Sequence, residues 1–193
     1  MMLFDLPLLP GLRFREDLIG RDEEAALISE IERTDLSPFR FQGWTGKRMT
    51  RTYGWRYDFD DRSFQPVDGM PEWLDALRGK AARFAGIGAG KFVHALVTRY
   101  DPGAAIGWHR DRPHFGTVVG ISLGSEAVLR FRKREASGFR RFSLTLPPRS
   151  AYILSGEARH DWEHSIAPAE QLRFSITFRA LSGKGLAAAG RLP

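Results

Sequence analysis

The 193-residue chain has no cysteine, no long apolar run and no internal repeat. Without cysteine it can form neither disulfides nor thiolate metal sites, and it has no cysteine nucleophile. No stretch approaches the ~20 apolar residues that span a bilayer. The first residues also lack the basic region and the cleavage site of a signal peptide. We therefore expect a cytoplasmic protein without membrane contact, in which any metal is held by His, Asp or Glu.

Negative charge is the scarcer sign, because 23 Asp and Glu stand against 29 Lys and Arg, which gives a net charge of +6 and a pI near 10.0. The arginines gather in three clusters, at residues 48–51, 130–134 and 140–141. A basic surface of this kind favours polyanions, since phosphate contacts release condensed counterions. Charge that serves only solubility is the alternative.

Length and apolar content fit a single domain, residues 1–193, with a sizeable core. Apolar residues at helical spacing predict helices over 21–34 and 71–84, and three glycines end the second helix. From residue 91 onward the pattern changes to short strands separated by turns, at 91–100, 117–123, 127–132, 142–146, 150–154 and 172–179. This spacing is typical of a β-barrel or a β-sandwich.

Two other regions have weaker patterns. Residues 40–60 are rich in arginine and aromatic side chains without a clean period, and we expect loops or a small hairpin at one mouth of the β-structure. The Gly/Ala-rich segment 181–193 is expected to be ordered only by docking onto the rest of the chain.

A histidine and a carboxylate lie two residues apart, at His109 and Asp111. If this stretch is extended, both side chains leave the same face of the strand, about 7 Å apart at Cα, and can share one ion. His164 is the best candidate for a third ligand. Two histidines and one carboxylate form the facial triad of non-haem Fe(II) oxygenases. Zinc with a water in an open position is the competing metal.

The strand predicted at 172–179 alternates strictly, so that Arg173 and Arg179 share one face with small hydroxyl residues. A guanidinium can clamp a carboxylate bidentately, and we expect this face to receive an anion. An exposed strand face with solvated arginines is the alternative. On the strand 91–100, the hydroxyl of Tyr100 could hydrogen-bond the same carboxylate.

These motifs occur along the chain in a fixed order: Arg99-Tyr100-Asp101-Pro102-Gly103, Ile106-Gly107-Trp108-His109-Arg110-Asp111, Ile121-Ser122-Leu123-Gly124, His164-Ser165-Ile166 and Arg173-Phe174-Ser175-Ile176-Thr177-Phe178-Arg179. Together they resemble the AlkB family of Fe(II)- and 2-oxoglutarate-dependent dioxygenases, in a form similar to bacterial AlkB. The resemblance implies an α+β fold. Its core would be a double-stranded β-helix (jelly roll) at about 91–180, with N-terminal helices and a nucleotide-recognition lid at about 40–60.

The resemblance also implies roles for individual residues. Fe(II) would be bound by His109, Asp111 and His164. Arg173 and Tyr100 would hold the distal carboxylate of 2-oxoglutarate, and Arg179 would lie near its other carboxylate. With O2 as the oxidant, the expected reaction is oxidative demethylation of bases such as 1-methyladenine and 3-methylcytosine. It would release formaldehyde, succinate and CO2, as in DNA alkylation repair.

Three positions depart from bacterial AlkB. Thr98 and Ser175 stand where that protein has asparagines, and we keep both as residues of the co-substrate pocket. Pro113, followed by His114, replaces an acidic residue near the bound base. The first two changes leave the iron ligands and the arginines intact, whereas the third leaves the base preference open.

The lid segment, residues 47–59, interleaves aromatic rings with arginines. Rings can stack on bases while guanidinium groups meet phosphates, so four residues are candidate substrate contacts: Arg51, Tyr53, Trp55 and Tyr57. A hydrophobic hairpin packed against the barrel, with its arginines in solvent, is the alternative. A base within a duplex would have to be flipped out or offered in a single strand.

The expected partner is methylated nucleic acid, DNA and possibly RNA, acted on by a monomer. Within the enzyme class, a tRNA- or RNA-modifying hydroxylase and a protein-directed oxygenase of the same family are alternatives. A non-enzymatic nucleic-acid binder on a jelly roll is the alternative from another class. That alternative does not require His109, Asp111 and His164 to converge.

Overall fold

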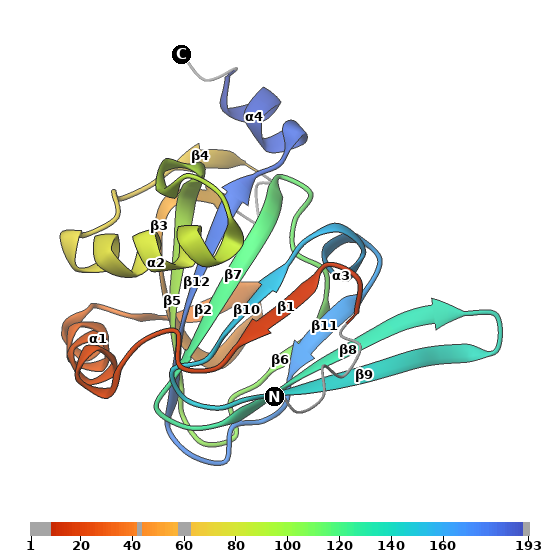
Figure 1. Cartoon of the computed structure of the whole chain (residues 1–193), viewed down its shortest axis with the longest axis horizontal. Helices are drawn as coiled ribbons and strands as arrows, with labels where there is room; N and C mark the ends of the chain where they lie inside the picture. Colours follow the sequence, from red (N-terminus) through yellow and green to blue (C-terminus); the bar gives the residue numbers. More distant parts are fainter. Residues whose placement is uncertain (1–8, 42–43, 58–62, 191–193) are drawn as a thin grey trace, which may run out of the picture.

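The computed structural model describes residues 9–41, 44–57 and 63–190. Two antiparallel β-sheets face each other, and helices cover the outer face of the larger sheet (Figure 1). The large sheet has the order β1-β10-β7-β12-β5-β3-β2, with β4 paired to β3, and the small sheet has the order β6-β11-β8-β9. Every strand pair in both sheets is antiparallel among the described residues. The predicted jelly-roll core is therefore confirmed.

All six strands predicted from residue 91 onward are present, and the structure adds two short strands, at 106–109 and 163–166, that the prediction did not include. The large sheet contains β1 (Leu12–Arg15), β2 (Ser37–Phe41), β3 (Trp44–Tyr57), β4 (Phe64–Pro66), β5 (Phe92–Tyr100), β7 (Phe115–Leu123), β10 (Ala151–Leu154) and β12 (Arg173–Leu181). The small sheet contains β6 (Ile106–His109), β8 (Ala127–Glu135), β9 (Gly138–Leu146) and β11 (Glu163–Ile166).

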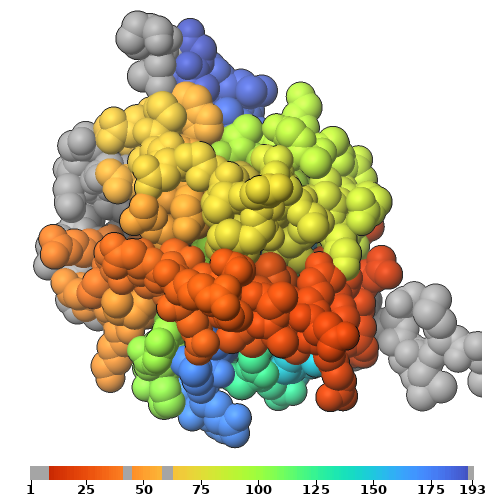
Figure 2. Space-filling view, turned by 90° about the vertical axis from the view of Figure 1, so that its left-hand side faces the viewer, coloured from red at the N-terminus to blue at the C-terminus, as the bar shows by residue number. Residues whose placement is uncertain are grey.

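Both predicted helices are present, as α1 (Arg21–Arg33) and α2 (Asp75–Ala85), and the first turn of the second is a separate 3-10 turn, η1 (Glu72–Leu74). Figure 2 shows the segments of α1 (orange-red) and α2 (yellow) side by side on one face of the molecule, and an ion pair between Lys80 and Glu23 joins them. Gly86 ends α2 in the left-handed region, at φ +74°, which glycine adopts without strain. The remaining short helices are η2 (Ala89–Lys91), α3 (Gly156–His160) and α4 (Gly183–Ala189). No helix in the described ranges is long and apolar enough to cross a membrane.

The strand β12 shows how the large sheet acquires two different faces. Alternation places Phe174, Ile176 and Phe178 in the core under the helices, as predicted. The residues between them face the small sheet, and they are Arg173, Ser175, Thr177 and Arg179. A second apolar cluster, which includes Val118, Leu129 and Phe131, fills the space between the sheets farther along. The polar end of this space contains the candidate site.

The region 40–60 differs from the prediction. The hairpin is present as β2 and β3, but β3 is one long strand that joins the large sheet beside β5, in register from Met49 opposite Arg99 to Gly54 opposite His94. Gly54 has φ +79°, and a Cβ there would overlap the carbonyl of Val93. This glycine interrupts the alternation, which explains why the sequence shows no clean period. Residues 42–43 and 58–60 of the predicted lid lie outside the described residues.

The segment after β12 docks onto the sheet, as predicted, at least to residue 190. Ser182 caps α4 by accepting a hydrogen bond from the backbone N–H of Gly185, and its hydroxyl donates to the carbonyl of Pro113 at 2.5 Å. A Cβ on Gly185 would overlap the carbonyl of His114. The helix α4 therefore holds the loop that follows Asp111. Residues 191–193 lie outside the described part of the chain.

Candidate metal and co-substrate site

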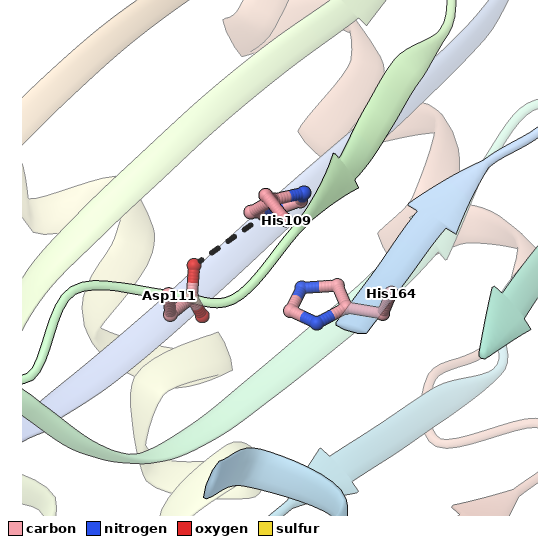
Figure 3. A group of neighbouring side chains, drawn as sticks. All are labelled: His109, Asp111 and His164. Atoms are coloured by element: carbon pink, nitrogen blue, oxygen red, sulfur yellow. Dashed lines mark ion pairs between the residues drawn. The ribbon is translucent and has the colours of Figure 1, made fainter. Parts of the chain in front are cut away.

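The residues His109, Asp111 and His164 converge from the end of β6, the loop that follows it and β11 (Figure 3). His109 is the last residue of β6, and His164 lies directly opposite it on β11, with 4.3 Å between ring centroids. Asp111 lies on the loop just beyond β6. The prediction that both residues lie on one extended strand is therefore correct for His109 and not for Asp111. One possible ligand atom from each residue lies within 4.8 Å of the other two. The predicted convergence is therefore observed.

Hydrogen bonding leaves lone pairs available in this group. His109 Nδ1 lies 2.9 Å from the carbonyl of Gly107, and because a carbonyl only accepts, Nδ1 carries the proton. Its Nε2 therefore carries the free lone pair, and this atom lies 3.9 Å from Oδ1 of Asp111. Nδ1 of His164 is buried without a partner among the described residues. Two imidazoles and a carboxylate oriented in this way can hold a divalent metal ion.

The charge state also suits a metal. Burial lowers the pKa of His164 to about 3, and the nearby His109 adds to this effect. Burial likewise lowers the pKa of His109. Burial alone would raise the pKa of Asp111, but the positive charge of Arg179 outweighs it, and the pKa lies far below the usual range. At neutral pH the group therefore presents two neutral imidazoles and one carboxylate, the protonation state that metal binding needs.

Two arginines hold Asp111 and its loop. Arg179 makes a bidentate contact with the carboxylate, with Nε 3.3 Å from Oδ2 and Nη2 3.2 Å from Oδ1. Its Nη1 lies 3.5 Å from Nδ1 of the buried His94. Arg159, only 2% exposed, donates to the carbonyls of Arg112, Phe115 and Gly116. The loop after the carboxylate is therefore fixed by a buried guanidinium that the sequence analysis did not identify.

A buried anion pocket lies beside this group, between β5, β12 and β7. Arg173 is only 1% exposed, and its Nη2 donates to the hydroxyl of Ser122 at 3.2 Å. Its Nε and Nη1 are buried without a partner among the described residues. The guanidinium lies 4.6 Å from the centre of the Tyr100 ring, directly opposite in register. A buried cation with two unpaired donors is costly unless an anion binds it, which argues against the solvated-arginine alternative.

Short hydroxyl side chains line the floor of this pocket. Thr98 and Ser175 form a buried cross-strand pair, and the Ser175 hydroxyl lies 3.4 Å from that of Tyr100. Burial by itself would raise the pKa of Tyr100, but the charges of Arg173 and Arg48 outweigh it and lower the pKa. The two positions that depart from bacterial AlkB thus lie where a co-substrate residue is expected.

The strand β3 contributes a residue that the sequence analysis missed. Antiparallel pairing from Met49 opposite Arg99 onward turns Arg48 toward the same face as Tyr100. Arg48 interacts with the Tyr100 hydroxyl and lies 3.8 Å from the centre of the Phe39 ring, and burial lowers its pKa. Arg48 is therefore a third arginine at the site.

The same alternation turns two of the predicted substrate contacts away from the site. Tyr53, 9% exposed, belongs to the core under the helices, opposite Ala95. Arg51 lies on that face too, where it pairs with Asp68. Tyr53 therefore packs in the core and Arg51 pairs with Asp68, so neither side chain lies on the face of β3 that forms the site.

The other two predicted contacts, Trp55 and Tyr57, lie beyond Gly54 in an aromatic cluster beside the metal loop. Trp55 stacks on Phe64 of β4 at 5.1 Å, and Phe64 stacks on His114 at 4.8 Å. Tyr57 lies 5.3 Å from His114, and the Arg112 guanidinium lies 4.7 Å from the Tyr57 ring. Half-buried rings at the mouth of a site can receive a flat ligand.

Comparison with known proteins fits this geometry. The family model of the 2OG-Fe(II) oxygenase superfamily matches residues 32–179. The chain is 27% identical to the uncharacterized protein L905 of Acanthamoeba polyphaga mimivirus, over 89% of this chain and 85% of that one. It is 28% identical to the alpha-ketoglutarate-dependent dioxygenase AlkB of Escherichia coli, over 74% and 68% of the two chains.

A further relative is much longer. The tRNA (carboxymethyluridine(34)-5-O)-methyltransferase ALKBH8 of Mus musculus is 27% identical over 82% of this chain. The match covers 24% of that protein, so this chain spans about a quarter of the length of that relative.

Two solved structures share the fold. OsALKBH1 matches with a TM-score of 0.68 at 17% identity, over 90% of this chain and 98% of that chain. A Pseudomonas putida prolyl-4-hydroxylase matches with a TM-score of 0.61 at 16% identity, over 90% and 94%.

The superfamily uses Fe(II), 2-oxoglutarate and O2, and the residues of this site fit the first two. Two neutral imidazoles and one carboxylate suit a ferrous ion. The unpaired donors of Arg173 suit a carboxylate of the co-substrate. The chain belongs to the 2OG-Fe(II) oxygenase superfamily, as an AlkB-like dioxygenase.

Proposed function

We propose that this dioxygenase removes methyl groups from alkylated bases of the 1-methyladenine and 3-methylcytosine type in nucleic acid, in DNA alkylation repair. When bound, iron and 2-oxoglutarate supply the oxidising chemistry, in which O2 is consumed and the co-substrate leaves as succinate and CO2. Hydroxylation of an N-methyl group yields formaldehyde and the free base. The observation that carries the proposal is the position of the aromatic cluster of Trp55, Tyr57, Phe64 and His114, directly beside the loop of Asp111.

The assigned roles follow from the site. His109, Asp111 and His164 hold the iron, while Arg179 keeps Asp111 ionised and oriented. Arg173 and Tyr100 take the distal carboxylate of 2-oxoglutarate in the dry pocket between β5 and β12.

A base reaches this centre only as a single-stranded or flipped nucleotide, because the metal group lies between two sheets. Trp55 and Tyr57 are the residues of the predicted lid that support base stacking, and His114 directly follows Pro113, which stands in place of the acidic residue of bacterial AlkB. The residues of the lid and the jelly roll are part of one domain, which we propose extends over the chain.

The outer face of the β8–β9 hairpin supports a polyanionic substrate. This hairpin projects from the body of the molecule (Figure 1). Arg132 lies between the rings of Trp108 and Phe139, at 4.6 Å and 4.7 Å from their centres, and Arg130 also lies over Trp108. Trp108 directly precedes the ligand His109 in the chain. Guanidinium groups spaced along this path can follow a phosphate backbone toward the metal centre.

Like charges also face each other across this hairpin, Arg132 opposite Arg141 and Lys133 opposite Arg140. Directly opposed like charges destabilise a strand pair. Glu163 pairs with Arg132, and both Glu157 and Asp161 pair with Lys133, whereas Arg140 and Arg141 have no acidic partner among the described residues. A bound phosphate chain would relieve the remaining repulsion, so binding should weaken steeply as salt is added.

The test measures formaldehyde and succinate with Fe(II), 2-oxoglutarate and O2. Single-stranded oligonucleotides with 1-methyladenine or 3-methylcytosine are offered as DNA and as RNA, with His109→Ala as the control. Equimolar formaldehyde and succinate, both lost in the variant, are expected. Succinate without formaldehyde on every oligonucleotide would overturn the demethylase assignment and direct attention to the protein-directed alternative.

RNA modification is a second candidate, because relatives named as tRNA-modifying ALKBH8 proteins match at 27% to 28% identity over more than four fifths of this chain. The same assay separates the two. Turnover on the RNA oligonucleotide that exceeds turnover on DNA, or a hydroxylated base that retains its carbon, favours the RNA-modifying function.

A further inference from the structure

The tyrosine of β10, Tyr152, has no role in the site described so far. In register, it lies directly opposite Gly120 of β7 and beside the row of residues that faces the small sheet. The tip of its ring lies directly against this glycine, because a Cβ built on Gly120 would overlap the ring and the hydroxyl of Tyr152. Gly120 does not have a positive φ, so its lack of a side chain serves this close approach and not a turn.

The position of the ring places its hydroxyl in the co-substrate pocket. Ser122, two residues from Gly120 on the same face of β7, accepts the hydrogen bond from Arg173. The tip of the Arg173 side chain and the ring of Tyr152 therefore occupy neighbouring positions along β7. The charged groups that act on the Tyr152 hydroxyl are Tyr100, Arg173, Asp111 and Arg179. The hydroxyl therefore lies within electrostatic range of the co-substrate residues and of the metal carboxylate.

The hydroxyl is available to a ligand. No group in the described ranges hydrogen-bonds it. Burial raises the pKa of Tyr152 above its usual value, so the hydroxyl keeps its proton at all ordinary pH values and acts as a donor. The tyrosine is only partly buried, so a ligand in the site can reach this hydroxyl and accept its proton.

We infer that Tyr152 is a further co-substrate residue, whose hydroxyl donates a hydrogen bond to the carboxylate of 2-oxoglutarate that Arg173 holds. Gly120 makes the space that lets the ring reach it. The bound carboxylate would then accept hydrogen bonds from Arg173, Tyr100 and Tyr152, which lie on three different strands of the large sheet. This inference rests on the proposed placement of 2-oxoglutarate at Arg173 and is independent of the nucleic-acid substrate.

The test is the dissociation constant of 2-oxoglutarate, measured by calorimetry on the Mn(II)-loaded protein without O2. Tyr152→Phe keeps the ring and removes one oxygen, and we expect the constant to rise about tenfold, as for the loss of one hydrogen bond to a charged group. Mn(II) binding should be unchanged. Tyr53→Phe, which removes the same atom from the opposite face of the sheet, is the matched control and should stay within about twofold.

A double variant tests the pairing with Gly120. Gly120→Ala should displace the ring of Tyr152 and weaken the binding of 2-oxoglutarate at least as much as Tyr152→Phe does. When Tyr152→Leu is already present, Gly120→Ala should raise the dissociation constant of 2-oxoglutarate little further, because the ring that the alanine would displace is gone. Additive losses would overturn the proposed role of Gly120.

Two outcomes separate this inference from the placement of the co-substrate. A large loss with Arg173→Lys but none with Tyr152→Phe would overturn the role of Tyr152 alone. No loss with either would overturn the placement at Arg173 as well. Pyruvate, a 2-oxo acid without the second carboxylate, should bind the native protein and Tyr152→Phe equally, and an equal loss for both acids would also contradict the inference.

Discussion

The two ends of the site are built differently, although neighbouring strands of one sheet contribute to both. At the co-substrate end, Arg173, Thr98 and Ser175 are buried within cross-strand pairs, and their neighbours are short hydroxyl groups. At the lid, Trp55 and Tyr57 are half-buried and contact other rings. The first end is rigid and shaped for one charged molecule, whereas the second offers stacking surfaces that tolerate different bases.

This difference teaches where specificity should reside. A buried guanidinium with unpaired donors discriminates strongly, because a ligand that fails to satisfy it leaves a charge exposed to an apolar interior. Stacked rings discriminate weakly, since every base has a flat face. We therefore expect single substitutions to have large effects at the co-substrate end and moderate, additive effects at the lid.

The largest effect should come from Asp111→Ala, which removes a metal ligand and also leaves Arg179 buried without its carboxylate. Formaldehyde release should fall to background. The free energy of unfolding of the metal-free protein should drop by about 3 kcal/mol, as for other broken buried ion pairs. Both are measured on the same preparation, by the coupled assay and by urea denaturation.

A double variant distinguishes the two causes. Asp111→Leu combined with Arg179→Met removes both charges and should restore most of the stability while activity stays at background. If the double variant were as unstable as Asp111→Ala, the buried ion pair would not be what stabilises this loop.

The next largest effect concerns the co-substrate end alone. Arg173→Lys keeps the charge but loses the planar fork, and the dissociation constant of 2-oxoglutarate should rise about 100-fold. The iron group lies on the other sheet, so metal affinity should stay within about twofold. Calorimetry with Mn(II) gives both values, and an unchanged 2-oxoglutarate constant would mean that the anion binds elsewhere.

A matched pair of arginines on β3 sharpens the comparison at the boundary between the two ends. Arg48→Gln removes a charge beside Tyr100 and should raise the KM for 2-oxoglutarate about tenfold. Arg51→Gln removes a charge on the opposite face, paired with Asp68, and should change that KM by less than about twofold. The reverse order of effects would show that β3 presents its other face to the site.

This pair also shows what the sequence could and could not predict. The strict alternation of residues 172–179 correctly predicted that Arg173 and Arg179 face inward, because apolar and polar positions alternate without interruption. The strand β3 has polar residues on both faces and Gly54 at a positive φ, so no alternation identified Arg48 as the inward residue. Arg159 and the proposed site residue Tyr152 could not be found in this way, because the contacts of each are tertiary and leave no local pattern.

The smallest effect should be the pH dependence of metal binding, and here a near absence of change is informative. Burial lowers the pKa of both histidines, to about 3 for His164, and Asp111 is held ionised by Arg179. A group with a lowered pKa keeps its unprotonated form as the pH falls through the ordinary value. Protons therefore compete little with the metal between pH 8 and pH 6.

Mn(II) affinity of the co-substrate-free protein should accordingly change by less than about twofold between pH 7.5 and pH 6.0. If both histidines had ordinary pKa values near 6.5, the Mn(II) affinity of the site would fall by about an order of magnitude over the same interval. Calorimetry at the two pH values decides between them. A tenfold loss would mean that the imidazoles are more solvated than their burial implies, and the metal end would then resemble the half-exposed lid more than the dry co-substrate pocket.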